Sequence, residues 1–175
     1  PETEIFSKGK ELFGLFEAKH HINKSNQVIV VEGYMDVISL YESGVKNAVA
    51  SLGTSFTKTQ FLLLRKIAET VIFMFDGDTA GKNAAHKALT VILPQLISTV
   101  NIQFVFLPEG KDPDSFIQSF GLKSFNKLIH QATPMSEFIF NLSSHGCNQN
   151  IAEGRAKLIK NLLSFFKIMS EGILK

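Results

Sequence analysis

Six acidic side chains fall in three short groups whose residue types and spacing suit the binding of a divalent metal ion. The three pairs are Glu32 and Asp36, Asp76 and Asp78, and Asp112 and Asp114. Carboxylate oxygens are hard ligands, which suit Mg²⁺ or Mn²⁺ and not zinc. Two such ions ~3.5–4 Å apart can stabilise both the attacking and the leaving oxygen of a phosphoryl or nucleotidyl transfer. The acids therefore predict metal-dependent chemistry on phosphates.

Asp76 and Asp78 give the strongest signal in this set, together with Glu32. The aspartates directly follow five apolar residues, which is a poor place for charges that have no function. Residues two apart in an extended chain point to the same side, and Gly77 between them would let a ligand approach the main chain. Carboxylates gathered in this way would take up protons through mutual repulsion unless a cation neutralised them.

Structural roles are the alternative for these acids. Asp112 precedes Pro113, the pattern of a helix N-cap followed by proline at the first helical position, and capping could be its whole role. Asp36 could be a first-turn acid that complements a helix dipole. Asp76 and Asp78 could belong to a solvated turn.

The acids lie where the predicted strands end. Apolar runs predict strands over residues 28–31, 48–51, 71–75 and 102–107, and helical patterns over 35–43, 57–68 and 81–93 separate them. Gly44 is expected to close the first of these helices, and Thr57 with Gln60 forms a capping box for the second. Alternating strands and helices predict an α/β fold with a mainly parallel, four-stranded sheet and flanking helices. Ligands of such sheets bind beyond the carboxyl ends of the strands.

Three parts are predicted along the chain. Residues 1–25 form a helical lead-in, with a helix over 6–18 capped by Ser7 and a polar stretch over 19–27. Residues 26–120 form the α/β domain. Residues 121–175 form a small, truncated all-helical subdomain, because the pattern is helical over 113–120, 123–132, 134–142 and 151–166, and a boundary is placed near Gly121.

The composition excludes several protein classes. The chain has 175 residues, a formal net charge of +2 and a single cysteine, Cys147, so neither a disulfide framework nor a cysteine zinc site can form within it. No apolar run approaches the ~20 residues that span a bilayer. The start at Pro1 without an initiator methionine suggests a fragment of a longer protein. The sixteen phenylalanines are expected mostly in the core.

Several strings resemble the Toprim motifs of bacterial replicative DNA primases. They are Glu32-Gly33-Tyr34-Met35-Asp36, Ser51-Leu52-Gly53-Thr54-Ser55, Asp76-Gly77-Asp78-Thr79-Ala80-Gly81, and the segment from Leu107 to Asp114. The N-terminal stretch from Pro1 to Gly9 is similar to the primase segment that leads into this domain. The resemblance covers about residues 1–140 and implies the Toprim fold for residues 26–120.

The resemblance also implies roles for individual residues. Glu32, Asp76, Asp78 and Lys8 would be catalytic, and a metal ion would be held by Glu32, Asp36, Asp76, Asp78, Asp112 and Asp114. Lys8 would face phosphate, although from the residues alone it could be a surface lysine beside a helix start. Lys82, which shares a predicted helix face with His86, could also reach nucleotide or nucleic-acid phosphate. The ion would be Mg²⁺, with Mn²⁺ as a substitute, and zinc would belong only to a domain absent from this chain. For Lys82, and more strongly for His86 on the same helix face, a solvated surface is the alternative.

The implied activity is the synthesis of RNA primers on single-stranded DNA from ribonucleoside triphosphates during DNA replication in the bacterial cytoplasm. The implied partners are the template, the triphosphates and a replicative helicase bound through a missing C-terminal domain, with no membrane. The fragment is expected to be a monomer, weakly active or inactive alone. No basic, aromatic-interleaved stretch is present, so weak binding of single-stranded DNA is predicted.

Two other classes remain open from the residues alone. A Toprim nuclease or topoisomerase would cut phosphodiesters, but a topoisomerase needs a nucleophilic tyrosine, and the only tyrosines, Tyr34 and Tyr41, lie beside the first motif. Metal-dependent nicking of plasmid DNA would favour a nuclease. A recombination or scaffolding module could keep the fold without chemistry, and Mn²⁺ binding would separate it from an enzyme.

Overall fold

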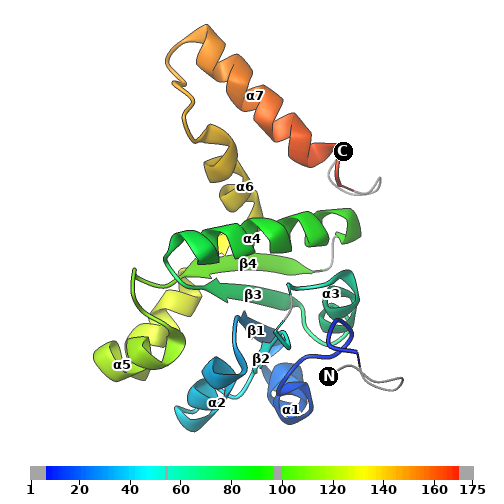
Figure 1. The fold of residues 1–175 in the computed structure, drawn as a ribbon, viewed down its shortest axis with the longest axis vertical. Helices are drawn as coiled ribbons and strands as arrows, with labels where there is room; N and C mark the ends of the chain where they lie inside the picture. Colours follow the sequence, from blue (N-terminus) through cyan, green and yellow to red (C-terminus); the bar gives the residue numbers. More distant parts are fainter. Residues whose placement is uncertain (1–6, 54, 97–99, 170–175) are drawn as a thin grey trace.

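One sheet organises the chain in the computed structural model, which describes residues 7–53, 55–96 and 100–169 (Figure 1). The strands are β1 (Gln27–Val31), β2 (Ala48–Ala50), β3 (Thr70–Phe75), β4 (Asn101–Phe106) and β5 (Thr133–Pro134), in the order β2-β1-β3-β4-β5. The first four pair in parallel, and β5 is antiparallel to β4. A mainly parallel α/β sheet is thus confirmed. The expected number of four strands is wrong by one, because a two-residue strand has no sequence periodicity.

Seven α-helices surround the sheet within the described ranges. They are α1 (Leu15–Ser25), α2 (Tyr34–Glu42), α3 (Lys58–Leu64), α4 (Thr79–Ile92), α5 (Pro113–His130), α6 (Met135–Ser144) and α7 (Ala152–Phe166), with a 3₁₀ turn, η1 (Leu93–Gln95), after α4. The Thr57 capping box begins α3 as predicted, since the Thr57 hydroxyl accepts from the Gln60 amide at 3.2 Å and the Thr57 amide donates to the Gln60 side chain at 2.9 Å. In the part of the chain that the structure describes, none of these helices is both long and apolar enough to cross a bilayer.

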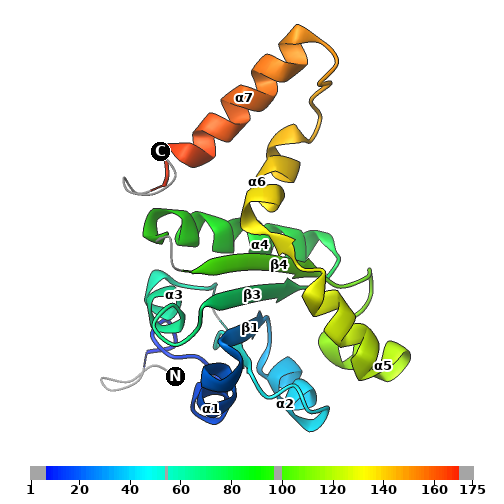
Figure 2. The same ribbon diagram turned by 180° about the vertical axis from the view of Figure 1, so that it is seen from behind.

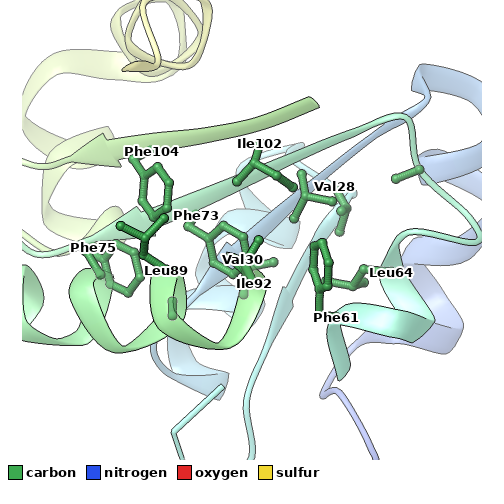
Figure 3. Close-up of a cluster of buried hydrophobic side chains, with 14 of the residues drawn as sticks. Val28, Val30, Phe61, Leu64, Phe73, Phe75, Leu89, Ile92, Ile102 and Phe104 are labelled. Atoms are coloured by element: carbon green, nitrogen blue, oxygen red, sulfur yellow. The ribbon is translucent and has the colours of Figure 1, made fainter. Parts of the chain in front are cut away.

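Both faces of the sheet are buried, which explains the continuous apolar runs of its strands. Alternate residues of each strand point to opposite faces, so Val28, Val30, Phe73 and Phe75 join one core cluster, and their neighbours join the other. Figure 3 shows Phe73, Phe75 and Phe104 facing Leu89 and Ile92 of α4. Helices α2 and α5 cover the second face through residues that include Val37, Leu40, Phe116 and Phe125.

The first helix begins nine residues later than predicted. Phe13 pairs instead with Ala50 of β2, its amide donating to the Ala50 carbonyl at 2.8 Å and its carbonyl accepting at 3.2 Å. Gly14 then adopts a φ of 77°, a conformation that glycine tolerates best, and α1 starts at Leu15. The helix extends through most of the polar stretch to Ser25, beyond its predicted end at residue 18, and its buried residues are Ala18 and Ile22. Ser7 therefore caps no helix.

The helical C-terminal part packs on the same core as the sheet. Helix α5 consists of two helical segments that meet at a kink at Gly121, where φ is 77° and ψ is 161°. The kink lies close to the predicted interruption between two helices. Phe138 of α6 stacks on Phe104 of β4 with ring centroids 4.4 Å apart. Figure 2 shows α6 and α7 as an angled pair of helices on the side of α4 away from α1 and α2. The division into three parts stays a prediction.

Candidate metal and phosphate site

Glu32 and Asp76 meet at the carboxyl ends of two neighbouring strands. Glu32 directly follows β1, Asp76 directly follows β3, and these parallel strands align Val30 with Phe73. The backbone amide of Asp76 donates a hydrogen bond to Glu32 Oε1 at 3.2 Å. Two acids 44 residues apart in the sequence are therefore neighbours in the fold, as the parallel topology predicted.

Asp76 is the electrostatic centre of the acidic cluster. Burial, as the largest cause, and the negative charges of Glu32, Asp36, Asp78 and Asp112, in decreasing order, together raise its pKa from 3.8 to about 6. A like charge disfavours ionisation only when it lies nearby. These four carboxylates therefore lie near enough to act on the charge of Asp76, and Glu32 is the one in direct contact with its residue.

Asp36 belongs both to a helix start and to the cluster. It lies in the first turn of α2, where its Oδ2 accepts a hydrogen bond from the Gly33 amide at 2.9 Å. Burial nevertheless raises the pKa of Asp36 by more than the hydrogen bond from Gly33 lowers it, and the charges of Asp112 and Asp114 make smaller contributions that also raise it. The structural role considered for Asp36, in the first turn of a helix, is thus present, and its role in metal binding stays a prediction.

Asp78 and Asp112 are N-caps. Asp78 Oδ1 accepts from the Gly81 amide at 2.7 Å and begins α4, and Asp112 Oδ1 accepts from the Ser115 amide at 2.7 Å and begins α5. The hydrogen bonds from Ser115 lower the pKa of Asp112, so this carboxylate is held ionised. Capping by Asp112 is confirmed, whereas the capping role of Asp78 was not predicted. Each cap engages one oxygen, which leaves the other available to a ligand.

Asp114 is held by two side chains that were not predicted. Ser39 of α2 donates to Asp114 Oδ1 at 2.6 Å, and Gln118 donates to Oδ2 at 2.9 Å. Gln118 could have been found from the sequence, because residues four apart on a helix are neighbours. Ser39 could not, because its contact depends on the packing of α2 against α5. Ser39 and Gln118 fix the orientation of this carboxylate.

Gly77 serves chain packing in a way that differs from the prediction. A Cβ atom at this position would overlap the Leu107 carbonyl oxygen and lie 3.0 Å from the Glu109 amide nitrogen. The missing side chain therefore makes room for the backbone that follows β4, and not for a ligand. The consequence for the site is that the loop leading to Asp112 is drawn against the end of β3.

Lys8 is placed by a buried glutamine. Gln60 is completely buried, and its side-chain nitrogen donates to the Lys8 carbonyl at 3.1 Å and to the Glu11 carbonyl at 2.7 Å. The Thr57 hydroxyl donates to the Gly9 carbonyl at 2.6 Å. The residues that begin α3 thus tie down the segment that carries half-buried Lys8. The sequence showed Thr57 and Gln60 only as a helix cap.

The remaining candidates are on the surface or outside the described residues. Lys82 and His86 are exposed on α4, and the His86 ring lies edge-on to Phe165 of α7 at 6.2 Å between centroids. Lys82 follows the Asp78 cap by four residues, and its amide donates to the Asp78 carbonyl at 3.2 Å. Thr54 and the N-terminal motif up to Phe6 lie outside the described residues.

The donor set fits a hard divalent cation bound together with a phosphate ligand. Among residues 7–53, 55–96 and 100–169, no group of three or more histidine, cysteine, aspartate or glutamate side chains is arranged to hold a metal ion by itself. Mg²⁺ is ordinarily bound through one or two carboxylates, with waters and substrate phosphates completing the octahedron. Glu32 and Asp76, with the free oxygens of Asp78 and Asp112 nearby, provide such a partial set.

Comparison with known proteins finds one family and many similar chains. The model of the Toprim-like family matches residues 29–117. DNA primase of Escherichia coli (strain K12) is 43% identical over 158 residues, which are 90% of this chain and 27% of that protein. DNA primase of Haemophilus influenzae is 45% identical over 159 residues, or 91% of this chain and 27% of that protein. The chain thus spans about a quarter of the length of these relatives.

Solved structures of similar chains agree with the fold. A DnaG primase catalytic domain bound to ssDNA has a TM-score of 0.89 and 41% identity, covering 98% of this chain and 56% of that chain. A DNA primase domain from Pseudomonas aeruginosa has a TM-score of 0.91 and 39% identity, covering 97% of this chain and 53% of that chain.

Proposed function

Since the chain belongs to the Toprim-like family, we propose that it is the metal-binding part of the catalytic core of a bacterial DNA primase. The proposed reaction is the synthesis of RNA primers on single-stranded DNA, in which a ribonucleotide 3′-hydroxyl attacks the α-phosphate of a ribonucleoside triphosphate and pyrophosphate leaves. The single observation that carries the proposal is the meeting of Glu32 and Asp76 inside a cluster of four further carboxylates.

The proposed roles follow from the geometry of that cluster. Glu32, Asp76 and Asp78 would hold Mg²⁺ or Mn²⁺, with Asp36, Asp112 and Asp114 as further ligands or as acids that orient them. When bound, the ion neutralises negative charge on the reacting phosphates, which is the main requirement of nucleotidyl transfer. The raised pKa of Asp76 indicates that a further negative charge is unfavourable at this edge of the sheet, so a bound cation is expected to stabilise the ionised carboxylates.

The proposed partners divide between this chain and the longer protein. A DnaG primase catalytic domain of similar fold is known bound to ssDNA, which supports single-stranded DNA as the template. Ribonucleoside triphosphates would be the substrates, and a replicative helicase would be bound by another part of the protein. Lys8 and Lys82 would contact phosphate, and the proposed setting is the bacterial replication fork.

Primer synthesis by the full-length enzyme tests the proposal. Asp76→Ala is expected to abolish synthesis of labelled RNA primers on a single-stranded template with little change in circular dichroism, because the role of this carboxylate is charge and position. Glu69→Ala is the matched control, since Glu69 is an exposed acid just before β3, at the opposite end of that strand from Asp76. A full-rate Asp76→Ala variant would reject the assignment. Nicking of plasmid DNA by the wild-type protein with Mn²⁺ would favour a nuclease instead.

A further inference from the structure

A cavity of about 340 Å³ opens beside Glu32, and no role has been assigned to it. Its walls come from the carboxyl-end halves of β1 and β3, from α4, and from the segment between β2 and α3. Its apolar lining includes Phe73 and Phe75, which face α4 in Figure 3, together with Ala84 and Ala88 of that helix. Glu32 belongs both to this wall and to the acidic cluster, so the cavity adjoins the proposed metal site.

Among residues 7–53, 55–96 and 100–169, the polar groups of the cavity have few hydrogen-bond partners. They are supplied by Ser51, Ser55, Asn83, Lys87 and Glu32. Ser51 is only 9% exposed, and among the described residues no group forms a hydrogen bond with its hydroxyl. The Ser51 hydroxyl lines the cavity, where it is open to solvent in the free protein and to the polar edge of a ligand in a complex.

The cavity has the chemistry of a nucleoside site. Small-molecule sites of roughly 300–1,000 Å³ are mostly apolar and carry a few polar groups that orient the ligand. A nucleobase has apolar faces, which suit the lining of Phe73 and Ala84, and a polar edge, which suits Ser51 and Asn83. The ammonium group of Lys87, which also lines the cavity, complements carbonyl oxygens or phosphate.

We propose that this cavity takes the nucleoside part of a ribonucleoside triphosphate whose phosphates lie at the edge formed by Glu32 and Asp76. The proposal rests on the proposed function, because it needs the phosphates to be held by metal at that edge. It adds that the chain itself recognises the sugar and base, through a surface on the α4 side of the sheet.

Calorimetric titration of the 175-residue chain with ATP and with inorganic triphosphate, both with Mn²⁺, distinguishes binding in the cavity from binding at the metal and phosphate site alone. Ala84→Phe fills the cavity, and Ser51→Ala removes the serine hydroxyl from its lining. Ala152→Phe, at an exposed position of α7, and Ser136→Ala, at an exposed position of α6, are the matched controls. The wild-type chain is expected to bind ATP about tenfold more tightly than triphosphate, a difference of roughly 1.4 kcal/mol. Ala84→Phe is expected to abolish that difference and Ser51→Ala to reduce it, with triphosphate binding and both controls unchanged.

Each other outcome is decisive. Equal affinity of the wild-type chain for ATP and triphosphate, unaffected by either cavity variant, would overturn the cavity proposal and leave the metal and phosphate site standing. Failure of both ligands to bind with Mn²⁺ would overturn the proposed function and the cavity with it. Circular dichroism establishes that each variant is folded, and if Ala84→Phe is not, the Ser51→Ala result decides.

Discussion

Asp76→Asn is predicted to stabilise the metal-free protein at neutral pH and to weaken its stabilisation by metal. In the folded chain the ionised form of Asp76 is disfavoured by burial and by neighbouring carboxylates, which raise its pKa from 3.8 to about 6. Fully expressed, this rise corresponds to about 3 kcal/mol. Because the side chain is partly exposed, screening by solvent reduces the expected effect to about 1–2 kcal/mol. Asparagine has nearly the same shape and carries no charge, so it removes this penalty.

The pH dependence has a definite sign. Between pH 3.8 and about 6 the folded state holds a proton on Asp76 that the unfolded state has lost. The free energy of unfolding of the wild-type chain therefore falls as the pH rises through this window. The stability that the proton on Asp76 contributes to the folded chain is fully present below pH 3.8 and is lost above about pH 6. The two proteins should differ little at pH 3.5 and most at pH 7.5.

Metal should reverse the order of stability. Free metal at about 100 times its dissociation constant adds about 2.7 kcal/mol to a protein that binds it only when folded. The wild-type chain should gain this amount with Mn²⁺, and Asp76→Asn should lose most of the gain. Urea unfolding, followed by circular dichroism, measures the free energy of unfolding of each protein with EDTA and with Mn²⁺, at pH 3.5 and at pH 7.5. Glu69→Gln controls for the loss of an exposed acid. An Asp76→Asn variant that is less stable than wild type in EDTA at pH 7.5 would refute the electrostatic reasoning.

Three further predictions concern the residues that position the acids. Asp78→Ala should cost about 1 kcal/mol in urea unfolding through loss of the α4 cap, whereas Asp78→Asn should keep the cap; both should lose the gain from Mn²⁺, and equal stability of the two variants would contradict the capping role. Gly77→Ala should destabilise the chain by more than about 2 kcal/mol, because backbone must move; a thermal melt unchanged from wild type would contradict the close packing on Leu107. Gln60→Leu should cost about 2 kcal/mol by leaving the Lys8 and Glu11 carbonyls unpaired, and it should speed proteolysis before residue 12; unchanged protection would show that Gln60 does not hold this segment.

The parallel sheet was predictable because its signals are local. Val28 to Val31 and Val71 to Phe75 are continuous apolar runs, which the burial of both faces requires. Once the strands were known to be parallel, the meeting of Glu32 and Asp76 followed from topology alone. The caps at Thr57 and Asp112 were also predictable, because their partners lie only three residues away in the sequence.

Features that depend on contacts between distant residues were not predictable. The pairing of Phe13 with Ala50 delays the start of α1, and the apolar spacing around it gave no sign of this. Strand β5 is defined by the pairing of Thr133 with Phe104, which lies 29 residues earlier in the chain. The hydrogen bond from Ser39 to Asp114 likewise needs α2 and α5 to be packed together. The function of Gly77 was misjudged for the same reason, since its close neighbour is Leu107.

The outer strands of the sheet have a consequence for self-association. A lateral strand with free amide and carbonyl groups is a template for pairing with another molecule. On one side, Phe13 occupies the groups of Ala50 from outside β2. On the other side, β5 is two residues long and ends in Pro134, which has no amide hydrogen to offer a further strand. Neither outer strand therefore offers a long run of free backbone groups, which limits pairing between the sheets of different molecules.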